Sequence, residues 1–428
     1  MLDIKFIREN PEKVKEGLKK KKATVGIVDE LLDFDKKWRG LTQEIEELRS
    51  THKADSKRIA ELAGAEKKTA ILQTAKQKEK MEAIEKKLKM FEEEVLLRMQ
   101  KLPNLPLDDV PAGKDESDNV ALREVGKKPT FNFTPKEYLP LAESLDLIDV
   151  ERAAKVSGSR FGYIKNEAAQ LEFALVQLAF QKLIPKGFSP IVPPVIIKEE
   201  MMNGMGYVDT EQDRQERYFF ESDRQYLVGT AEQSVGPMYA KEMIPENKFP
   251  LRFAAFSPCF RREAGSYGKD TKGILRVHQF DKIEMFSFVR PEQSTDEHKL
   301  FVAIEEELMK DLELPYRVVQ LCTGDLSRPS ASTVDIETWF PGQNGGKGLY
   351  RETHSSSNCT DFQARRLQIK YRDADGKNSF VHTVNGTAFA VGRILAAIIE
   401  NNQADDGSIR IPKALLLWMN GKTAITHK

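Results

Sequence analysis

The residues best suited to chemistry lie in the run FRREAGSYGKDTKGILRVHQFDKIEMF, residues 260–286. Arg261 and Arg262 carry planar guanidinium groups that suit phosphate and carboxylate oxygens. Glu263, the next residue, offers acceptor oxygens to an exocyclic amine. The pattern favours a segment that holds a nucleotide, and a surface hairpin with scattered charge is the alternative.

The middle of this run is a glycine-rich loop, and its composition permits a wide and mobile turn at Gly265, Gly268 and Gly273. Residues 274–280 are strand-like. They would return an aromatic ring, Phe280, and a carboxylate, Glu284, to the side of the outgoing strand. We therefore expect a strand, a loop and a second strand that together form one face of a binding site.

The composition limits the classes of protein that fit. A chain of 428 residues is too long for one ordinary core, so we expect two domains. Lys plus Arg balance Asp plus Glu at 66 each, so nucleic-acid binding must come from local charge separation. The N-terminus lacks a signal-peptide core, and no window approaches the roughly 20 apolar residues that span a bilayer. Three widely spaced cysteines argue against a zinc knuckle or a disulfide framework: Cys259, Cys322 and Cys359. A cytoplasmic protein fits best.

Residues 27–100 contain two stretches with heptad spacing, separated by a break near Gly64. The first has large apolar residues at Leu31, Phe34, Trp38, Leu41, Ile45 and Leu48, and the second has them at Met81, Ile84, Leu88, Phe91 and Val95. The two stretches can fold back on each other. We expect an antiparallel coiled-coil arm about 50 Å long, at 1.5 Å rise per residue.

Charge is polarised along this arm. Residues 49–80 hold nine Lys/Arg and four Asp/Glu, whereas residues 27–48 and 81–100 together hold seven and twelve. The outer half would attract a polyanion, although charges that merely keep a coiled coil in solution are the alternative. The candidate polyanion-binding side chains of this basic half are Lys53, Lys57, Arg58, Lys67, Lys68 and Lys76.

A proline-containing linker at residues 102–120 ends the arm. We place an N-terminal domain at residues 1–110 and a second domain at residues 111–428. In the second domain, residues 166–183 have helical periodicity. Residues 191–197 form a strand-like run whose two prolines confine it to a sheet edge or a subunit boundary.

Later segments alternate between strand and helix without a regular βαβ rhythm. Strand-like runs occur near residues 218–220, 253–256, 277–288, 316–321, 367–371 and 380–384, and helical ones at 295–312 and 390–400. We therefore expect an α+β domain with a mostly antiparallel sheet flanked by helices. No Walker GxxxxGK[ST] motif or clean GxGxxG after a strand is present, which disfavours the parallel-sheet nucleotide folds.

Along essentially its whole length, the chain closely resembles the seryl-tRNA synthetases. The resemblance rests on the paired heptads and on ordered motifs: GTAEQ at 229–233, CFRREAGSYGKDT at 259–271, RVHQFDKIEMF at 276–286, ETHSSSNCTDFQARR at 352–366 and NGTAFAVGR at 385–393. This family belongs to the class II synthetases, whose antiparallel catalytic sheet holds ATP. The resemblance implies a serine–tRNA ligase that uses ATP and Mg²⁺ to form seryl-adenylate and then charges tRNA(Ser).

The resemblance implies roles for the ATP-binding residues. Arg261 would bridge the α-phosphate and the serine carboxylate, and Arg393 would cover the adenine and reach the γ-phosphate; these two are the expected catalytic residues. Glu263 would accept from the adenine amine, Val277 would contact the nucleotide through its backbone, and Phe280 would stack on the base. The complete ATP set is Arg261, Arg262, Glu263, Val277, Phe280, Glu352, Thr353, His354, Ser355 and Arg393.

Within this set, the family's acidic segment implies that Glu352 and Ser355 hold Mg²⁺ together with ATP, as hard oxygen ligands. Thr353 and His354 lie between them. His354 departs from the aliphatic residue more usual in the family, and we expect a packing or hydrogen-bonding role for it.

Serine differs from its analogues by one hydroxyl, so its pocket must supply hydrogen bonds that are left unpaired when the hydroxyl is missing. The resemblance assigns this task to Thr230, Ala231, Glu232, Arg261, Glu284, Asn385 and Thr387. Many members of the family have serine in place of Thr387. The hydroxyl is kept, and the extra methyl should narrow the pocket.

The resemblance also implies a homodimer, because residues 187–197, with Pro193, match the class II dimer motif. The arm of one subunit would guide tRNA to the active site of the other, and the glycine-rich loop would meet the acceptor end. Recognition through shape and backbone suits a long hairpin with a basic tip.

Two other classes of protein are alternatives to a serine–tRNA ligase. A coiled-coil interaction protein with a non-catalytic domain is disfavoured by the intact set of Arg261, Glu263, Glu284, Glu352 and Arg393. An enzyme that loads serine onto something other than tRNA would be favoured by a missing arm, and the arm is present.

Overall fold

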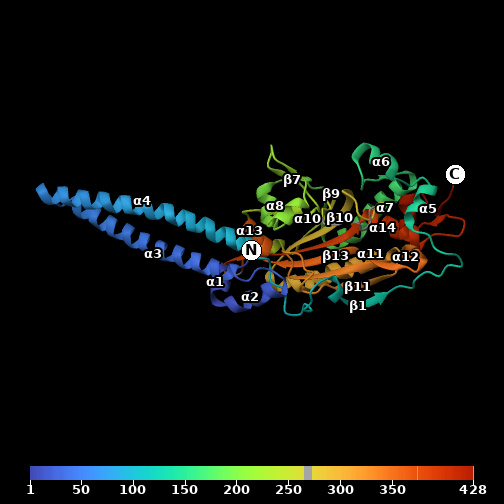
Figure 1. The fold of residues 1–428 in the computed structure, drawn as a ribbon, viewed down its shortest axis with the longest axis horizontal. Coiled ribbons are helices and arrows are strands. Elements are labelled where there is room, and N and C mark those ends of the chain that lie inside the picture. Colours follow the sequence, from blue (N-terminus) through green and yellow to red (C-terminus); the bar gives the residue numbers. More distant parts are fainter. Residues whose placement is uncertain (265–271, 374, 428) are drawn as a thin grey trace. The chain divides into compact units, whose positions relative to one another are not determined.

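The computed structural model describes residues 1–264, 272–373 and 375–427 (Figure 1). It divides into two compact units, residues 2–103 and residues 104–428 with Met1, whereas the sequence analysis placed the boundary after residue 110. Most of the glycine-rich loop, including Gly265 and Gly268, lies outside the described residues. None of the helices that the structure describes is both long and apolar enough to cross a membrane.

The smaller unit is helical and contains the predicted arm. Its helices are α1 Ile4–Glu9, α2 Pro11–Lys20, α3 Ile27–Ile59 and α4 Gly64–Lys101. Helices α3 and α4 run side by side with a reversal at residues 60–63 (Figure 1). The antiparallel arm is therefore confirmed.

Contacts between α3 and α4 follow the heptad pattern. The rings of Phe34 and Phe91 lie 5.8 Å apart, centroid to centroid. An ion pair of 2.7 Å joins Arg49 on α3 to Glu85 on α4. Both side chains of this pair are about half exposed, so it adds little stability and the apolar seam holds the helices together.

The larger unit is built on a sheet that has eight strands within the described residues, in the order β1-β11-β12-β13-β16-β10-β9-β4. Their bounds are β1 Val120–Val125, β4 Phe188–Ile191, β9 Leu251–Phe260, β10 Gln279–Val289, β11 Tyr316–Gln320, β12 Ser332–Phe340, β13 Leu349–Thr360 and β16 His382–Ala390. Neighbours are antiparallel except β4 and β9. This confirms the expected α+β architecture.

Helices cover both faces of this sheet. Alternation along β10 separates the two cores: Ile283 and Met285 belong to one cluster, and Phe286 and Phe288 belong to the other. The first cluster packs against α7 Asn166–Leu183, α11 Ser294–Asp311 and α14 Val391–Asn401. The second lies on the face of α8 Glu199–Met205, α10 Glu232–Val235 and α13 Phe362–Leu367.

Shorter elements complete the unit. The helices are α5 Tyr138–Ser144, α6 Val150–Ser157, α9 Glu211–Gln215 and α12 Gln343–Gly346. The strands of the small sheets are β2 Ile148–Asp149, β3 Tyr163–Ile164, β5 Ile196–Lys198, β6 Phe219–Phe220, β7 Gln225–Leu227, β8 Met243–Ile244, β14 Lys370–Arg372, β15 Asn378–Phe380, β17 Ile409–Arg410 and β18 Ala424–Ile425.

Two strand predictions were wrong in extent. The run at 191–197 is split at its prolines into the end of β4, an edge strand of the large sheet, and β5, which pairs in a different sheet. The return run at 274–280 becomes strand only at Gln279. Gly273 has a φ of +81°, and the amide of Ile274 donates to the Tyr138 hydroxyl at 2.7 Å, so the chain first turns into the core.

Candidate active site

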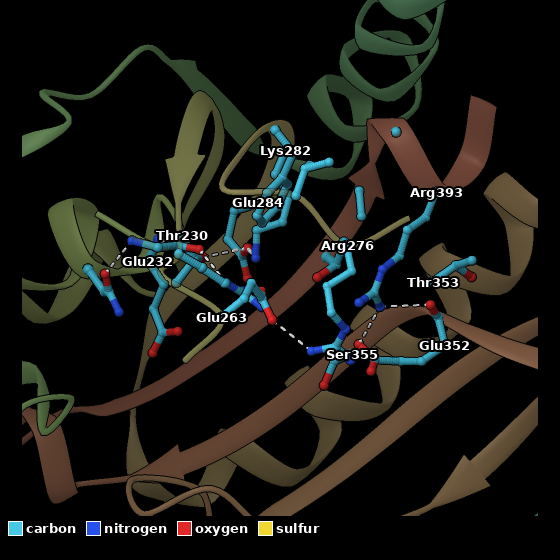
Figure 2. A pocket seen from close by; sticks show the side chains of 18 of the residues that line it. Thr230, Glu232, Glu263, Arg276, Lys282, Glu284, Glu352, Thr353, Ser355 and Arg393 are labelled. Carbon is cyan, nitrogen blue, oxygen red and sulfur yellow. Dashed lines mark hydrogen bonds and ion pairs between the residues drawn. The ribbon is translucent and has the colours of Figure 1, made fainter. Parts of the chain in front are cut away.

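Most of the predicted site residues line one pocket on the face of the sheet that α10 and α13 cover (Figure 2). The structure brings together Thr230, Glu232, Arg261, Glu263, Val277, Phe280, Glu284, Glu352, Thr353, Ser355, Asn385, Thr387 and Arg393. Ala231, Arg262 and His354 are not among the lining residues.

Two β-bulges shape this pocket. In β13, Glu352 pairs with residue 337 and His354 with residue 336, so Thr353 is an extra residue in the ladder. Residues three apart on a regular strand face opposite sides, but the bulge lets Glu352 and Ser355 both face the pocket. A second bulge, in β16 at Ala388, likewise lets Thr387 and Ala390 both face the pocket.

The same bulge sends His354 to the other side of the sheet. Its ring lies 6.1 Å from that of Phe389, a core residue, in an edge-to-face arrangement. His354 is 1% exposed, and burial lowers its pKa to about 3. It is therefore a neutral, packed histidine near neutral pH.

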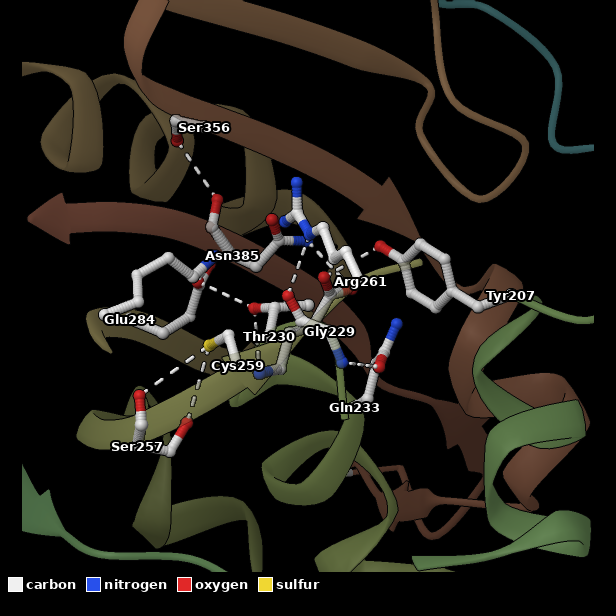
Figure 3. A network of polar contacts seen from close by, with 12 residues as sticks. Tyr207, Gly229, Thr230, Gln233, Ser257, Cys259, Arg261, Glu284, Ser356 and Asn385 are labelled. Atoms are coloured by element: carbon white, nitrogen blue, oxygen red, sulfur yellow. Dashed lines mark hydrogen bonds and ion pairs between the residues drawn. The ribbon is translucent and has the colours of Figure 1, made fainter. Parts of the chain in front are cut away.

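One end of the pocket is a buried polar network around Glu232, which is 3% exposed. Figure 3 shows Tyr207, Thr230, Glu284 and Asn385 of this network. The Tyr207 hydroxyl donates to one carboxylate oxygen at 2.7 Å, and the Gln363 amide donates to the other at 2.7 Å. The amide nitrogen of Asn385 also reaches that second oxygen, at 3.2 Å. These donors fix the position of the carboxylate.

Beside it lies a second buried carboxylate, Glu284, which is 2% exposed. The Thr230 hydroxyl donates to it at 2.8 Å, and Lys282 forms an ion pair with it (Figure 2). Thr387 is its direct neighbour across the β10–β16 ladder. Two carboxylates, two hydroxyls and one ammonium thus share a small volume.

The two carboxylates influence each other. Burial, followed by the nearby charge of Glu284, raises the pKa of Glu232 to about 7, although Gln363 and Tyr207 oppose the rise. Glu232 is therefore about half ionised near neutral pH. A bound ammonium group would favour its charged form.

Arg261 lies next to this network. Its Nε donates to the carbonyl of Gly229 at 3.1 Å, and its Cζ lies 5.3 Å from the centroid of the Phe280 ring. No carboxylate of the described residues forms an ion pair with it. Its terminal nitrogens are thus available to an anion in the pocket.

Two ion pairs mark the opposite end of the pocket (Figure 2). Arg393 Nη1 lies 3.1 Å from Glu352 Oε1 and donates to the Glu352 carbonyl at 2.8 Å. Arg276 Nη1 lies 2.7 Å from Glu263 Oε2. Partial desolvation in the pocket would raise the pKa of the Glu352 carboxyl, whose side chain is about half exposed. The charges of Arg393 and Arg261 outweigh this effect and hold the pKa below its usual range.

Arg262 and Ala231, the two other predicted residues outside the pocket lining, contact other parts of the protein. Arg262 turns toward Tyr218, with its Cζ 5.5 Å from the ring centroid, and its backbone amide donates to the carbonyl of Glu216 at 3.1 Å. Ala231 precedes α10 and is buried in the apolar cluster of that face.

The structure adds lining residues that the sequence analysis did not select, namely Lys282, Arg276, Tyr207 and Arg217, and a buried partner, Gln363. Alternation could have identified Lys282, because it precedes Glu284 by two residues on one strand and shares its face. Tyr207 and Arg217 come from segments with no recognisable pattern. Gln363 belongs to the motif at residues 352–366, but only the fold brings it to Glu232.

The oxygens of Glu352 and Ser355 fit Mg²⁺, which prefers hard oxygen ligands. Glu352 is ionised at neutral pH because its pKa is lowered. In the described part of the chain, no cluster of three or more His, Cys, Asp or Glu side chains could hold a metal by itself.

The predicted tRNA-binding side chains of the arm are all exposed. They lie in the second half of α3 and the first half of α4: Lys53, Lys57, Arg58, Lys67, Lys68 and Lys76. Their ammonium and guanidinium groups are accessible to a polyanion.

Two family models match the chain. Residues 1–106 match the family model of the seryl-tRNA synthetase N-terminal domain. Residues 218–402 match that of the class II tRNA synthetase core domain, which serves synthetases for G, H, P, S and T.

Full-length relatives are similar as well. The serine–tRNA ligase of Dictyoglomus turgidum is 43% identical over 417 residues, 97% of each chain, and that of Thermobifida fusca is 42% identical over 97% of this chain and 96% of its own. A seryl-tRNA synthetase from Pyrococcus horikoshii, solved with ATP, has a TM-score of 0.94 at 40% identity and full coverage of both chains. A cytoplasmic serine–tRNA ligase from Naegleria fowleri, solved with AMP, has a TM-score of 0.89 at 30% identity, over 100% of this chain and 99% of its own. The predicted resemblance is thereby confirmed, and the chain belongs to the seryl-tRNA synthetase family of class II aminoacyl-tRNA ligases.

Proposed function

We propose that this chain, as a serine–tRNA ligase, activates L-serine with ATP and then charges tRNA(Ser). An oxygen of the serine carboxylate attacks the α-phosphorus of ATP, a new O–P bond forms, and pyrophosphate leaves. A ribose hydroxyl at the 3′ end of tRNA then attacks the seryl carbonyl, and AMP leaves. The observation that carries this proposal is the juxtaposition of a buried carboxylate–hydroxyl network with Arg261.

Serine selection is the task of the buried network. Glu232 and Glu284 attract the serine ammonium, and Thr230, Asn385 and Thr387 surround the hydroxyl. A substrate without the hydroxyl leaves buried polar groups unpaired, which costs about 1–3 kcal/mol. Ala231 supports this site through its backbone position before α10.

Arg261 acts on the reacting groups. Its fork bridges the serine carboxylate and the α-phosphate, and it stabilises the negative charge that develops on the phosphoryl oxygens. Because Gly229 accepts from Nε, the guanidinium is already oriented before the substrates bind. Pre-orientation of this kind lowers the entropic cost of reaching the transition state.

Several residues bind ATP. Phe280 stacks on the adenine, Val277 contacts the nucleotide through its backbone, and Glu263 accepts from the exocyclic amine. Arg393 covers the other face of the base and reaches the γ-phosphate, and Thr353 lines the same pocket. Arg262 and His354, which the sequence predicted as members of this set, lie outside the lining and are given no contact with ATP. The solved relative with ATP supports a nucleotide in this pocket.

Glu352 and Ser355 would hold Mg²⁺ together with ATP. When bound, the ion neutralises phosphate charge and orients the phosphates. The Glu352 carboxylate, which pairs with Arg393 at 3.1 Å, would supply one oxygen ligand, and Arg393 would reach the phosphates beside it.

Serine-dependent ATP–pyrophosphate exchange tests the activity. The purified full chain is assayed with each of the twenty amino acids, and we expect exchange with serine far above all others. No exchange above a blank would refute the catalytic proposal, and equal exchange with several amino acids would refute serine selection.

The arm is proposed to bind tRNA through its exposed basic side chains. A variant lacking residues 30–98 should keep exchange, because the pocket lies in the other unit, and should lose tRNA charging. Charging that survives would favour an enzyme whose acceptor does not need the arm.

We also propose a homodimer that works in the cytoplasm. Large apolar side chains of the predicted dimer motif lie exposed, with Val192 75% and Ile196 46% exposed, as expected of an interface. Sedimentation should give twice the chain mass, and a monomer at working concentration would refute the dimer. Fractionation of cells should recover the protein with the soluble tRNA pool, and recovery in another compartment would refute the location.

A further inference from the structure

Arg217 lines the pocket beside Arg261 and lacks a counter-ion in the described part of the chain. Its Nη1 makes one long hydrogen bond, 3.4 Å, to the carbonyl of Glu216. Its Nε is buried and has no partner. A buried guanidinium without a carboxylate is costly, so its place in a binding pocket points to an anionic ligand.

Two contacts place Arg217 at the end of the pocket that holds Glu232. Its Cζ lies 5.7 Å from the Tyr207 ring centroid, and the Tyr207 hydroxyl donates to Glu232. A methyl group on Gly229 would lie 3.6 Å from Arg217 Nη1 and 3.5 Å from Arg261 Cγ. The two arginine side chains therefore flank the same glycine.

The electrostatics agree with this geometry. Burial, followed by the positive charge of Arg261, lowers the pKa of Arg217. Two guanidinium groups so close together repel each other until an anion lies between them. Glu232 and Glu284 attract the serine ammonium, so the carboxylate on the same carbon faces the arginines.

We propose that Arg217 is a second guanidinium that binds the serine carboxylate, together with Arg261, before activation. The proposal rests on the proposed function and deepens it. Arg217 would make the site selective for amino acids over amines and amides that lack a free carboxylate.

The test compares L-serine with L-serinamide, which lacks the carboxylate charge, in the exchange assay. In Arg217→Met, we expect the KM for serine to rise roughly ten- to hundredfold, which corresponds to one charge-assisted contact. The inhibition constant of serinamide and the KM for ATP should change less than about twofold. Arg217→Gln keeps a polar side chain and serves the same comparison if the Met variant does not fold.

Arg214→Met is the matched control. This variant removes the same charge from α9, where Arg214 lies 3.9 Å from Glu199 and outside the pocket. The KM for serine and the inhibition constant of serinamide should both stay at wild-type values. If Arg217→Met weakened the binding of serine and of serinamide equally, Arg217 would have only a structural role and the proposal would be overturned. A higher KM for ATP with an unchanged KM for serine would overturn it in favour of a phosphate contact. Absence of exchange in the wild-type chain would refute the proposed function instead.

Discussion

The two ends of the pocket are built differently. At the serine end, Thr230, Glu232 and Glu284 are 6%, 3% and 2% exposed and bond to partners within the protein. At the nucleotide end, the side chains of Arg393 and Glu352 are 26% and 52% exposed and pair with each other. One end is a closed network formed before substrate arrives, and the other is a set of open ion pairs that can exchange partners.

This difference has an energetic reason. To distinguish a substrate by one hydroxyl, the pocket needs buried polar groups that lose a hydrogen bond when the hydroxyl is missing. This loss costs most free energy where water cannot replace the hydroxyl, so the serine end must exclude water. The phosphates of ATP bring several charges of their own, and partly solvated arginines can meet them at a smaller desolvation cost. Substitutions at the two ends should therefore affect different constants, the KM for serine or the KM for ATP, and by different amounts.

Arg261, at the junction of the two ends, should show the largest effect. Arg261→Ala should lower the exchange rate roughly 10²–10³-fold or more, because it removes charge stabilisation from the transition state. The melting temperature should change little, since the guanidinium makes one hydrogen bond to the described protein. An Arg261→Ala variant with wild-type exchange would refute the role given to this residue.

The serine end should be sensitive to the loss of a single hydroxyl. Thr230→Val keeps the shape but removes the donor to Glu284, and we expect the KM for serine to rise about tenfold with the KM for ATP unchanged. Discrimination against alanine should fall by a similar factor. Equal changes in both KM values would show that the two ends are not independent.

The same end should respond to pH through Glu232. Its pKa of about 7 predicts that the KM for serine falls as pH rises from 6 to 8, because the ionised carboxylate binds the ammonium. Glu232→Gln should flatten this profile. A profile that keeps its slope in the variant would assign the titration to another group.

The stability of the fold should fall with rising pH, whereas the affinity for serine should rise, and the fall in stability should occur at lower pH. The pKa of Glu232 is raised in the fold, so the unfolded carboxyl ionises first. The free energy of unfolding should thus fall as pH rises from about 4.5 to about 7. Chemical denaturation of wild type and Glu232→Gln at several pH values isolates this contribution, and parallel curves would contradict it.

The nucleotide end should show the smallest effect. Arg393→Lys keeps the charge but not the planar fork, and we expect the KM for ATP to rise roughly three- to tenfold while the KM for serine is unchanged. Higher ionic strength should reduce the difference, since the pair is partly exposed. A larger loss than that of Arg261→Ala would reverse the comparison between the two ends.

Sequence patterns predicted the elements that carry local periodicity. The heptads identified the arm, and the helical spacing at 166–183 matches α7 in both bounds. The segment at 191–197 was predicted as one strand but lies in two sheets, because its prolines cannot join a ladder. Strands β12 and β13 were not predicted. Strand β13 carries few apolar residues, whereas β12 was missed although Val334, Ile336 and Phe340 lie on one face of it.

Motifs predicted most of the pocket lining, since GTAE, RRE, ETHS and NGT each remain contiguous in the chain. They did not predict which neighbours within a motif share a face. His354 and Ser355 are adjacent in sequence, yet one packs against Phe389 and the other faces the pocket. The pairing of Glu352 with Arg393 also depended on where α14 begins.

The sequence by itself determined the family, the antiparallel arm, the mixed architecture and most of the residues that line the pocket, because these depend on periodicity and on contiguous motifs. The tertiary structure alone decided which of those residues meet. Two bulges turned Glu352 and Ser355 to one side, and Arg217, Tyr207 and Gln363 arrived from distant segments. The physical reason is that strand register and helix packing are set by the burial of the whole core, which no local pattern encodes.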